Sequence, residues 1–262
     1  MSNTKDFSEV EKNRYNDMSS KVLSNIDETY LKKIGSHNFK DYYKEPYLEY
    51  EKYILENVNK NHKVLELCCG NGIHSFTISK TGADLKSFDY SKASIEIAKK
   101  RHKLLNGNIV FNVADVNELN LSNKFDYIVC IGSLSYIDND ILIENLKKWL
   151  KPKGRFILID SLNHNIFYRL NRFIRYLRKQ RSWRLNLNIP SNKTLKKFSN
   201  NFNVVRVDYY GVFLFLTPLL KVFFDEYTIS KIIKLIDFKI LRIYAFKIFC
   251  VYEKKLTSSG IN

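Results

Sequence analysis

The chain has 262 residues, of which 45% are hydrophobic and 14% aromatic, so it holds enough apolar side chain to fill a sizeable core and is not generally disordered. Its 43 Lys and Arg against 27 Asp and Glu give a formal net charge of +16, which favours polyanionic, phosphorylated or membrane-surface partners. With only 9 Gly and 4 Pro, a collagen-like or linker-rich chain is excluded.

The first 60 residues are predicted to be mostly helical and to form a lid rather than an independent domain. Their start lacks the apolar core of a signal peptide. No window of the chain reaches about 18 uninterrupted apolar residues, so a membrane-spanning helix is not expected. The four cysteines include no C-x-x-C pair and no metal-ligand spacing, which predicts no metal site and a reduced, cytoplasmic setting.

Residues 61–160 alternate between strand and helix patterns and are predicted to form the core that binds a cofactor. Short apolar strands are predicted at 63–67, 83–88, 108–113, 125–131 and 155–160, and helices at 73–80, 92–105 and 140–150. Alternation of this kind predicts an α/β fold with a doubly wound, mostly parallel, Rossmann-like sheet and right-handed crossovers.

A glycine-bearing turn, Cys-Cys-Gly-Asn-Gly at 68–72, follows the first predicted strand. Glycines at such a turn let a ligand approach the backbone closely, and the helix that follows offers free N–H groups. Asp89 ends the second strand, at a distance where a carboxylate can receive both hydroxyls of a ribose. A nicotinamide dinucleotide matches less well, because the turn lacks the third glycine of G-x-G-x-x-G.

The motifs at 64–72, 89–91, 114–116, 125–130 and 150–155 occur in the same order as in the class I S-adenosylmethionine-dependent methyltransferases, which this chain resembles over roughly residues 62–160. One departure is Cys68, which stands where that family carries its first glycine. The resemblance implies a methyltransferase that uses S-adenosyl-L-methionine. It also implies the cofactor-binding residues, which are Glu66, Cys68, Gly70, Asn71, Gly72, Asp89, Tyr90, Ala114, Asp115, Val116 and Ile131.

The methyl acceptor is expected beyond the carboxyl ends of the fourth and fifth strands, where ligands of open α/β sheets bind. His164 is predicted to be the general base for a hydroxyl acceptor, with capping of a neighbouring helix as the alternative. Tyr136 is predicted to orient the acceptor, with packing in its loop as the alternative. Ser133 and Ser135 are predicted to contact the acceptor. His74 is expected to have a local structural or cofactor-side role.

Residues 161–201 carry ten basic side chains and no acid. A helix is predicted at 165–180, with its apolar side lying on the protein and its arginines turned toward an anionic group. The predicted acceptor-binding residues of this helix are Arg169, Arg172 and Arg175. An acidic lipid surface and an ordinary solvated face are the alternatives for the same helix.

Residues 161–262 are predicted to complete the same domain, with late strands at 202–207 and 246–252. The apolar segment 210–224 is predicted to be buried core, with an interfacial membrane patch as the alternative. Short stretches of this part, such as Ser-Leu-Asn-His-Asn at 161–165, resemble methyltransferases of bacterial cell-surface glycan biosynthesis.

Together these patterns predict a cytoplasmic transferase that methylates an anionic small-molecule or glycan acceptor at oxygen, with or without peripheral membrane contact. An RNA methyltransferase is a weaker alternative, because no Asn/Asp-Pro-Pro-Tyr/Phe motif follows the fourth strand and no RNA-binding module is evident. A noncatalytic cofactor-binding or membrane-associated accessory protein is the third alternative. The acceptor's identity and the oligomeric state do not follow from the sequence.

Overall fold

The structure is a computed structural model that describes residues 2–107, 109–178, 182–237 and 239–256. Two predicted elements reach beyond these ranges, the strand at 108–113 and the helix at 165–180. Lys179 and Arg181 of the basic stretch lie outside the described residues. The same holds for residue 1 of the predicted lid and residues 257–262 of the predicted C-terminal part. That division at residues 60 and 160 stays a prediction.

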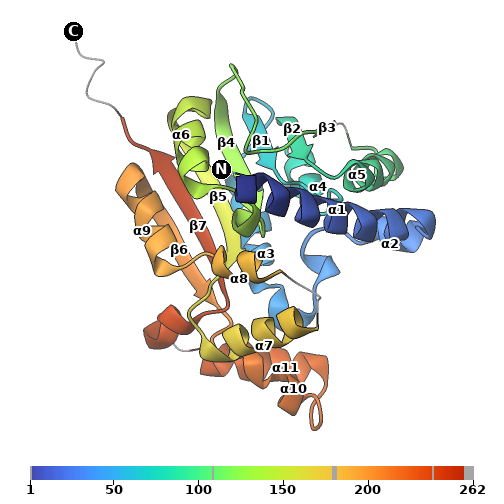
Figure 1. Ribbon diagram of the computed structural model, residues 1–262, viewed down its shortest axis with the longest axis vertical. Coiled ribbons are helices and arrows are strands. Elements are labelled where there is room, and N and C mark those ends of the chain that lie inside the picture. Colours follow the sequence, from blue (N-terminus) through green and yellow to red (C-terminus); the bar gives the residue numbers. More distant parts are fainter. Residues whose placement is uncertain (1, 108, 179–181, 238, 257–262) are drawn as a thin grey trace.

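A sheet of seven strands forms the centre of the described part of the chain, in the order β3-β2-β1-β4-β5-β7-β6 (Figure 1). The five strands from β3 to β5 are parallel to one another, whereas β7 is antiparallel to both β5 and β6. The strands are β1 Lys63–Leu67, β2 Asp84–Asp89, β3 Val110–Val113, β4 Phe125–Ile131, β5 Leu150–Ser161, β6 Phe202–Tyr210 and β7 Lys247–Lys254. The doubly wound, mostly parallel sheet predicted from the sequence is therefore confirmed.

Helices lie before, between and after the strands. The α-helices are α1 Ser2–Ser24, α2 Glu28–Lys32, α3 Glu45–Asn57, α4 Ser75–Ser79, α5 Lys92–Leu104, α6 Asn139–Trp149, α7 Ile166–Leu177, α8 Trp183–Leu187, α9 Asn192–Asn201, α10 Thr217–Leu220 and α11 Glu226–Ile236. Short 3-10 helices are η1 Gly35–Asn38, η2 Asp41–Tyr43, η3 Leu134–Tyr136, η4 Leu214–Leu216 and η5 Lys239–Tyr244.

Both faces of the sheet are covered, and β4 shows why its sequence is almost continuously apolar. Successive side chains of a strand point to opposite faces. Ile128 and Cys130 join the core under α6 and α9, whereas Tyr127 and Val129 join the core under α3 and α4. A strand buried on both faces needs apolar residues at every position, as parallel sheets typically show.

The N-terminal helix α1 packs along α5, at the side of the sheet where β2 and β3 lie (Figure 1). The amide oxygen of Asn16 accepts hydrogen bonds from the hydroxyl of Ser91 (3.1 Å) and the backbone N–H of Ala93 (3.2 Å). The hydroxyls of Ser19 and Ser94 are 2.7 Å apart. These polar contacts fix α1 beside the end of β2, where Asp89 lies.

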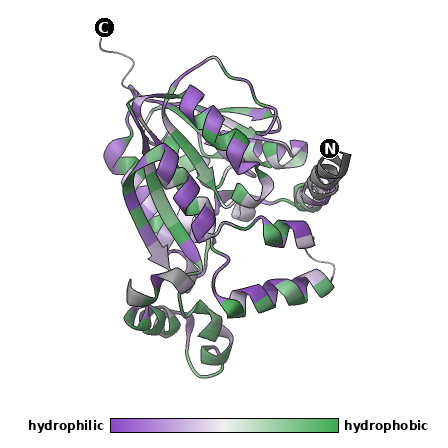
Figure 2. Cartoon of the chain, turned by 60° about the vertical axis from the view of Figure 1, so that its left-hand side comes forward, coloured by the Kyte–Doolittle hydropathy of each residue, from purple (hydrophilic) through white to green (hydrophobic). Residues whose placement is uncertain are grey.

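The helices α7, α10 and α11, which we call the cap, gather at the lower end of Figure 1. Their shared core is formed with η2 and η4 and contains the buried side chains of Tyr42, Tyr168, Leu214, Ile229 and Ile233. Hydrophobic residues dominate α10 and α11, which are largely green in Figure 2. Among the described residues, no helix combines the length and apolar character needed to cross a bilayer.

Two sequence predictions about the cap differ from the structure. The segment 210–224 was expected to be core, which holds for Leu214 and Thr217 but not for Val222 and Phe223, whose side chains are 72% and 71% exposed. The apolar side of α7 was expected to lie on the protein, and the structure shows it exposed instead. The physical reason is that Tyr168, on another side of α7, is buried and donates a hydrogen bond to the backbone oxygen of Gly211.

Candidate functional site

A cavity of about 250 Å³ opens at the carboxyl ends of β1 and β4. The chain order in the sheet reverses between these two strands, which is where open α/β sheets bind ligands. The predicted residues that line the cavity are Glu66, Cys68, Gly70, Asn71, Asp89, Tyr90, Ile131, Ser133 and Tyr136. It is also lined by His74, for which a local structural or cofactor-side role was expected, and by residues that were not among the predicted site residues, namely Tyr15, Phe39, Tyr47, Leu67, Cys69, Ile73 and Gly132.

The turn after β1 has a left-handed backbone at three positions, with φ of 54° at Cys68, 54° at Gly70 and 75° at Gly72. A side chain at Gly72 would place its Cβ 3.0 Å from that of Ala98 on α5, so glycine allows the close packing of turn and helix. At Gly70 the nearest atom to such a Cβ is the Tyr15 hydroxyl oxygen, at 4.0 Å. The backbone of Gly70 is thus open to the cavity, as a ligand cradle requires.

Asp89 connects the end of β2 to this turn. Its carboxylate accepts hydrogen bonds from the backbone N–H groups of Gly70 and Ser91, both at 2.9 Å, and the side chain is 4% exposed. Burial raises the pKa of Asp89, and the two N–H groups partly offset that rise. A carboxylate has about four acceptor positions, so it can receive ligand hydroxyls in addition to these two bonds.

Three tyrosines surround the Asp89 end of the cavity. The ring of Tyr15 meets those of Tyr90 and Tyr136 edge-on, with centroids 6.1 and 6.3 Å away. Burial, with a smaller contribution from the Asp89 carboxylate, raises the pKa of Tyr15 to about 12, so its hydroxyl stays neutral. This end of the cavity is therefore an aromatic enclosure around one buried acid, suited to a nucleoside.

Glu66 lies on β1 at the base of the cavity. Its Oε2 accepts hydrogen bonds from the hydroxyls of Ser75 (2.6 Å) and Ser87 (2.7 Å). Burial raises the pKa of Glu66 to about 7, although both hydroxyls act in the opposite direction. The carboxyl group therefore changes its charge near neutrality, facing the ligand space.

The opposite end of the cavity is an aromatic stack. Tyr47 stacks on Phe39 with ring centroids 3.8 Å apart and on His74 with centroids 5.1 Å apart. Burial lowers the pKa of His74 to about 3, with a smaller contribution from the nearby charge of Lys247, so the imidazole is neutral. Its Nδ1 is buried and has no hydrogen-bond partner among the described residues.

Several predicted cofactor residues lie beside the cavity rather than on its wall. Gly72 packs on α5, and the N–H of Ala114 donates to the backbone oxygen of Asp89. Asp115 accepts two hydrogen bonds from Asn117, whose side-chain amide also contacts the backbone oxygen of Tyr136 at 3.4 Å. Val116 is buried in the adjoining core, and so is Ser135, which was predicted to contact the acceptor.

The residues predicted to act on the acceptor from the 161–201 region are not among those lining the cavity. His164 Nε2 accepts a hydrogen bond from the backbone N–H of Asn192 at 2.6 Å, at the start of α9, which matches its helix-capping alternative. Arg172 is buried and donates to the backbone oxygen of Leu162 and the side-chain oxygen of Asn163. The other two predicted arginines, Arg169 and Arg175, are exposed on α7.

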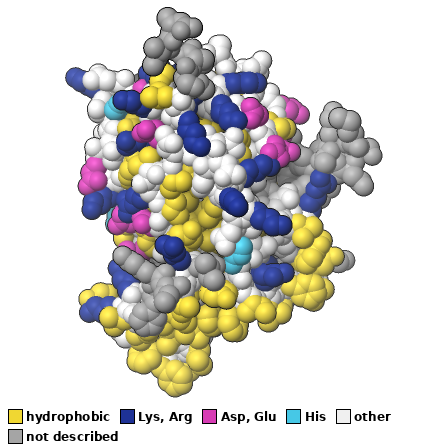
Figure 3. All heavy atoms as spheres, turned by 90° about the vertical axis from the view of Figure 1, so that its left-hand side faces the viewer, with side chains coloured by type: hydrophobic (Ala, Val, Ile, Leu, Met, Phe, Trp, Pro, Cys, Tyr) yellow, Lys and Arg dark blue, Asp and Glu magenta, His cyan; other side chains and the backbone are white. Residues whose placement is uncertain are grey.

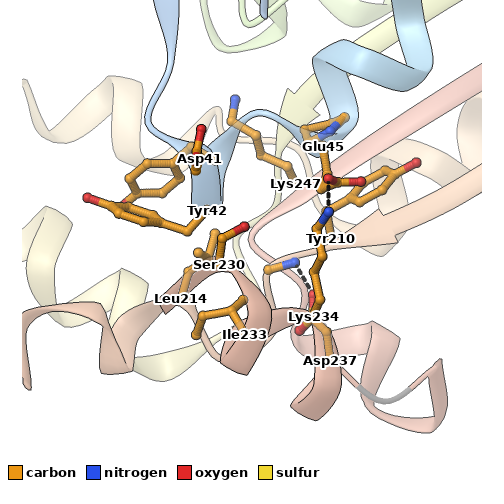
Figure 4. Close-up of a pocket in the computed structure, with 13 residues that line it drawn as sticks. Asp41, Tyr42, Glu45, Tyr210, Leu214, Ser230, Ile233, Lys234, Asp237 and Lys247 are labelled. Carbon is orange, nitrogen blue, oxygen red and sulfur yellow. Dashed lines mark hydrogen bonds and ion pairs between the residues drawn. The ribbon is translucent and has the colours of Figure 1, made fainter. Parts of the chain in front are cut away.

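A second cavity lies between the cap and the sheet (Figure 4) and measures about 30 Å³, the space of roughly one water molecule. Lys234 of α11 points up to Glu45 at the start of α3 and forms an ion pair with it. Asp237 accepts the N–H groups of Gly211 (2.6 Å) and Val212 (2.7 Å). This polar cluster fastens the cap to the sheet and leaves no room for a substrate.

The fold and the larger cavity together define the chain as a Rossmann-like protein with a nucleoside site at the switch point of its sheet. Residues 58–201, more than half of the chain, match the family model described as a methyltransferase domain. The chain belongs to this family. The S-adenosylmethionine-dependent methyltransferase class and the cofactor predicted from the sequence are thereby confirmed.

Curated relatives and solved structures agree with this assignment. The chain is 31% identical over 119 residues to the mitochondrial ubiquinone biosynthesis O-methyltransferase of Schizosaccharomyces pombe, a match that covers 44% of this chain and 43% of the relative. A protein of the same description from Coxiella burnetii is 30% identical over 117 residues, covering 44% and 50%. The matches thus span about half the length of these relatives or less.

Among solved structures, the fold resembles that of the geranyl diphosphate C-methyltransferase of Streptomyces coelicolor, determined with Mg²⁺, geranyl diphosphate and S-adenosyl-L-homocysteine. The TM-score is 0.58, the sequence identity is 13%, and the match covers 79% of this chain and 78% of the other. At this identity the likeness concerns the fold.

The charge of Glu66 leads to a pH-dependent prediction. We expect S-adenosylmethionine to bind more tightly as the pH rises from about 5 to 7, by up to about tenfold per pH unit, because a protonated Glu66 cannot attract this cationic ligand. Calorimetry across this range measures the effect. The variant Glu66→Gln should bind with little dependence on pH; a wild-type affinity that is flat, or that falls toward pH 7, would contradict the prediction.

The left-handed backbone at Cys68 leads to a stability prediction. Glycine adopts φ of 54° without strain, whereas a residue with a Cβ does so at a cost of about 1–2 kcal/mol. We expect Cys68→Gly to be about 1 kcal/mol more stable than Cys68→Ala in urea unfolding. Because both variants lack the thiol, the comparison isolates the backbone, and equal stabilities would show that the turn is not strained there.

Proposed function

We propose that the chain transfers a methyl group from S-adenosylmethionine to a hydroxyl oxygen of a small-molecule acceptor. The observation that carries this proposal is the cavity at the switch point, with an adenosine end at Asp89 and an aromatic end at His74. The names of the curated relatives, which are O-methyltransferases, support oxygen as the methylated atom.

The residues of the cavity fit the cofactor. Asp89 offers a buried carboxylate for the two ribose hydroxyls, and the open left-handed backbone at Gly70 admits a ligand at close range. Tyr15 and Tyr90 supply aromatic surface for the adenine ring. When bound, S-adenosylmethionine supplies an electrophilic methyl group on a sulfonium centre.

We assign the acceptor to the aromatic end of the cavity, between the glycine turn and the Phe39–Tyr47–His74 stack. The neutral imidazole of His74 has a buried Nδ1 that has no hydrogen-bond partner among the described residues. That nitrogen is suited to accept a hydrogen bond from the acceptor hydroxyl, which orients the oxygen for in-line attack on the methyl group. As the new O–CH3 bond forms and the S–CH3 bond breaks, the hydroxyl proton passes to solvent. His164 and the arginines of α7 do not line this space, so we place the acceptor-positioning role on His74.

The anionic or glycan character of the acceptor stays a prediction from the sequence. It was motivated by Arg169, Arg172 and Arg175, which are not among the residues that line the cavity. A cation that does lie beside the aromatic stack is Lys247, whose Nζ lies 5.2 Å from the ring centroid of Tyr47.

The experiment that tests the function is a methyl-transfer assay on the full chain with labelled S-adenosylmethionine. Phenols, catechols, sugar nucleotides, lipid-linked saccharides and RNA serve as acceptors. Label in a low-molecular-weight hydroxyl compound is the expected result. Transfer to RNA alone would favour the RNA methyltransferase alternative, and cofactor binding without transfer to any acceptor would favour the noncatalytic one.

A further inference from the structure

A large apolar surface is exposed on the cap. On α7 it comprises Ile166, Phe167, Leu170, Phe173, Ile174 and Leu177, which we call the α7 apolar face, and it continues at Leu219, Val222, Phe223 and Phe224. The two parts meet where the ring of Phe167 stacks on that of Phe215, with centroids 4.1 Å apart. Figure 3 shows hydrophobic side chains gathered over this lower end of the molecule.

The orientation of α7 is the reverse of that in an ordinary surface helix, whose apolar side faces the core. At about 100° per residue, the α7 apolar face occupies an arc of about 120°, and Tyr168 and Arg172 lie on the opposite side of the helix. Both of these residues are buried. The Tyr168 hydroxyl donates to the backbone oxygen of Gly211 at 2.6 Å, and Arg172 donates to that of Leu162 at 3.0 Å. These bonds hold the apolar face outward.

Basic side chains flank this face. With the same helical geometry, Arg169 borders one side of the apolar arc, and Arg178 and Arg175 lie beyond its other side; all three are exposed. Residues 161–201 contain no acid that would neutralise them. Trp183 lies at the edge, 46% exposed, with its ring in contact with Phe173 and Tyr176. An apolar arc with flanking arginines and a border of amphipathic aromatic rings is typical of helices that lie in a membrane interface.

We propose that the cap docks on an anionic lipid bilayer, with α7 in the plane of the interface and the α7 apolar face and Phe223 in the acyl boundary. Charge complementarity selects this occupant. In a two-fold dimer through the α7 apolar face, the flanking arginines of two copies would come together, and residues 161–201 hold no acid to pair with them. A bilayer with acidic headgroups offers an acyl region for the apolar side chains and negative charge for the arginines. The proposal does not depend on methyl transfer.

The experiment is co-sedimentation of the full chain with phosphatidylcholine vesicles that contain or lack phosphatidylglycerol. We expect binding to the anionic vesicles and weaker binding as salt is added. Replacing Arg169, Arg175 and Arg178 by Gln should lower the partition coefficient about hundredfold, at about fivefold per charge. The matched control, which also removes three positive charges, replaces the exposed α5 residues Lys92, Lys100 and Lys103 by Gln and should bind nearly as the wild type does.

The apolar contribution is tested by Ile166→Ser, Leu170→Ser and Leu177→Ser together, which should lower the partition coefficient at least about tenfold. These side chains are 70%, 56% and 62% exposed, so the fold should persist. The wild type offers a measurement that needs no variant, because Trp183 is exposed whereas Trp149 is buried. On anionic vesicles the Trp183 emission should shift to the blue and be quenched by brominated lipids.

Three outcomes would overturn the proposal. The first is a wild-type chain that does not bind anionic vesicles, or whose binding survives both triple replacements. The second is a concentration-dependent dimer that the serine variant abolishes, without vesicle binding, since a second copy would then cover the face. The third is RNA retention, without vesicle binding, that is lost with the arginines.

Discussion

Replacing Asp89 by Ala is expected to weaken the binding of S-adenosylmethionine and of S-adenosylhomocysteine by about tenfold to hundredfold. The carboxylate is buried, holds the N–H of Gly70 in the turn, and is the acceptor we assign to the ribose hydroxyls. Loss of charge-assisted hydrogen bonds on this scale costs about 1–3 kcal/mol. Calorimetry with both ligands measures the effect.

Asp84→Ala is the matched control, because Asp84 begins the same strand, β2, at its opposite and exposed end. It should leave both affinities unchanged. NAD should bind neither the wild type nor the variants. Equal affinities in Asp89→Ala and the wild type, or an absence of binding in the wild type, would refute the placement of the adenosine.

Replacing His74 by Phe is expected to lower turnover about hundredfold while cofactor affinity changes little. Phenylalanine keeps an aromatic ring in the stack with Phe39 and Tyr47 but removes the unpartnered Nδ1. Misplacing a reacting group by about 1 Å can lower the rate about hundredfold. Steady-state kinetics with the acceptor found in the transfer assay would separate kcat from the Michaelis constants.

His164→Ala serves as the comparison for the same assay. Because His164 is hydrogen-bonded to the start of α9, we expect its loss to affect stability more than turnover. The opposite result, with turnover lost in His164→Ala and kept in His74→Phe, would restore the general base predicted from the sequence. An unchanged turnover in both variants would place the acceptor-positioning group elsewhere.

The sheet could be predicted from the sequence because its signals are local. The boundaries predicted for the first and fourth strands coincide with β1 and β4, and β4 is apolar except at Asp126 because both of its faces are covered. The turn that follows β1 was identified by Gly70 and Gly72, whose positive φ the backbone requires. Asp89 was predicted to lie beside this turn because the first two strands of such a sheet are neighbours.

The remaining residues of the cavity wall could not be predicted in the same way, because they come from segments that only the tertiary structure brings together. Tyr15 reaches the cavity from α1, and Phe39 and Tyr47 reach it from the segment before β1. Nothing in the local pattern distinguishes these tyrosines from those of an ordinary core. His74 was noted in the sequence, but its buried, unpartnered nitrogen is a property of the packed structure.

The direction of α7 shows a further limit of sequence patterns. Helical periodicity identifies which residues share a side, and it did so correctly for the α7 apolar face, but it does not say whether that side meets protein or solvent. The deciding contacts are the hydrogen bonds of Tyr168 to Gly211 and of Arg172 to Leu162. The first of these joins residues 43 positions apart, which no local pattern records.

The position of α1 has a consequence for the exchange of the cofactor in each catalytic cycle. The adenosine end of the cavity has Tyr15 on its wall, on a helix that is held against α5 by the contacts of Asn16 and Ser19. Release of the spent cofactor is therefore expected to depend on how firmly α1 is held against α5. Exchange of the nucleoside, at the start and at the end of each cycle, would then be faster in a chain whose Asn16 and Ser19 contacts are lost.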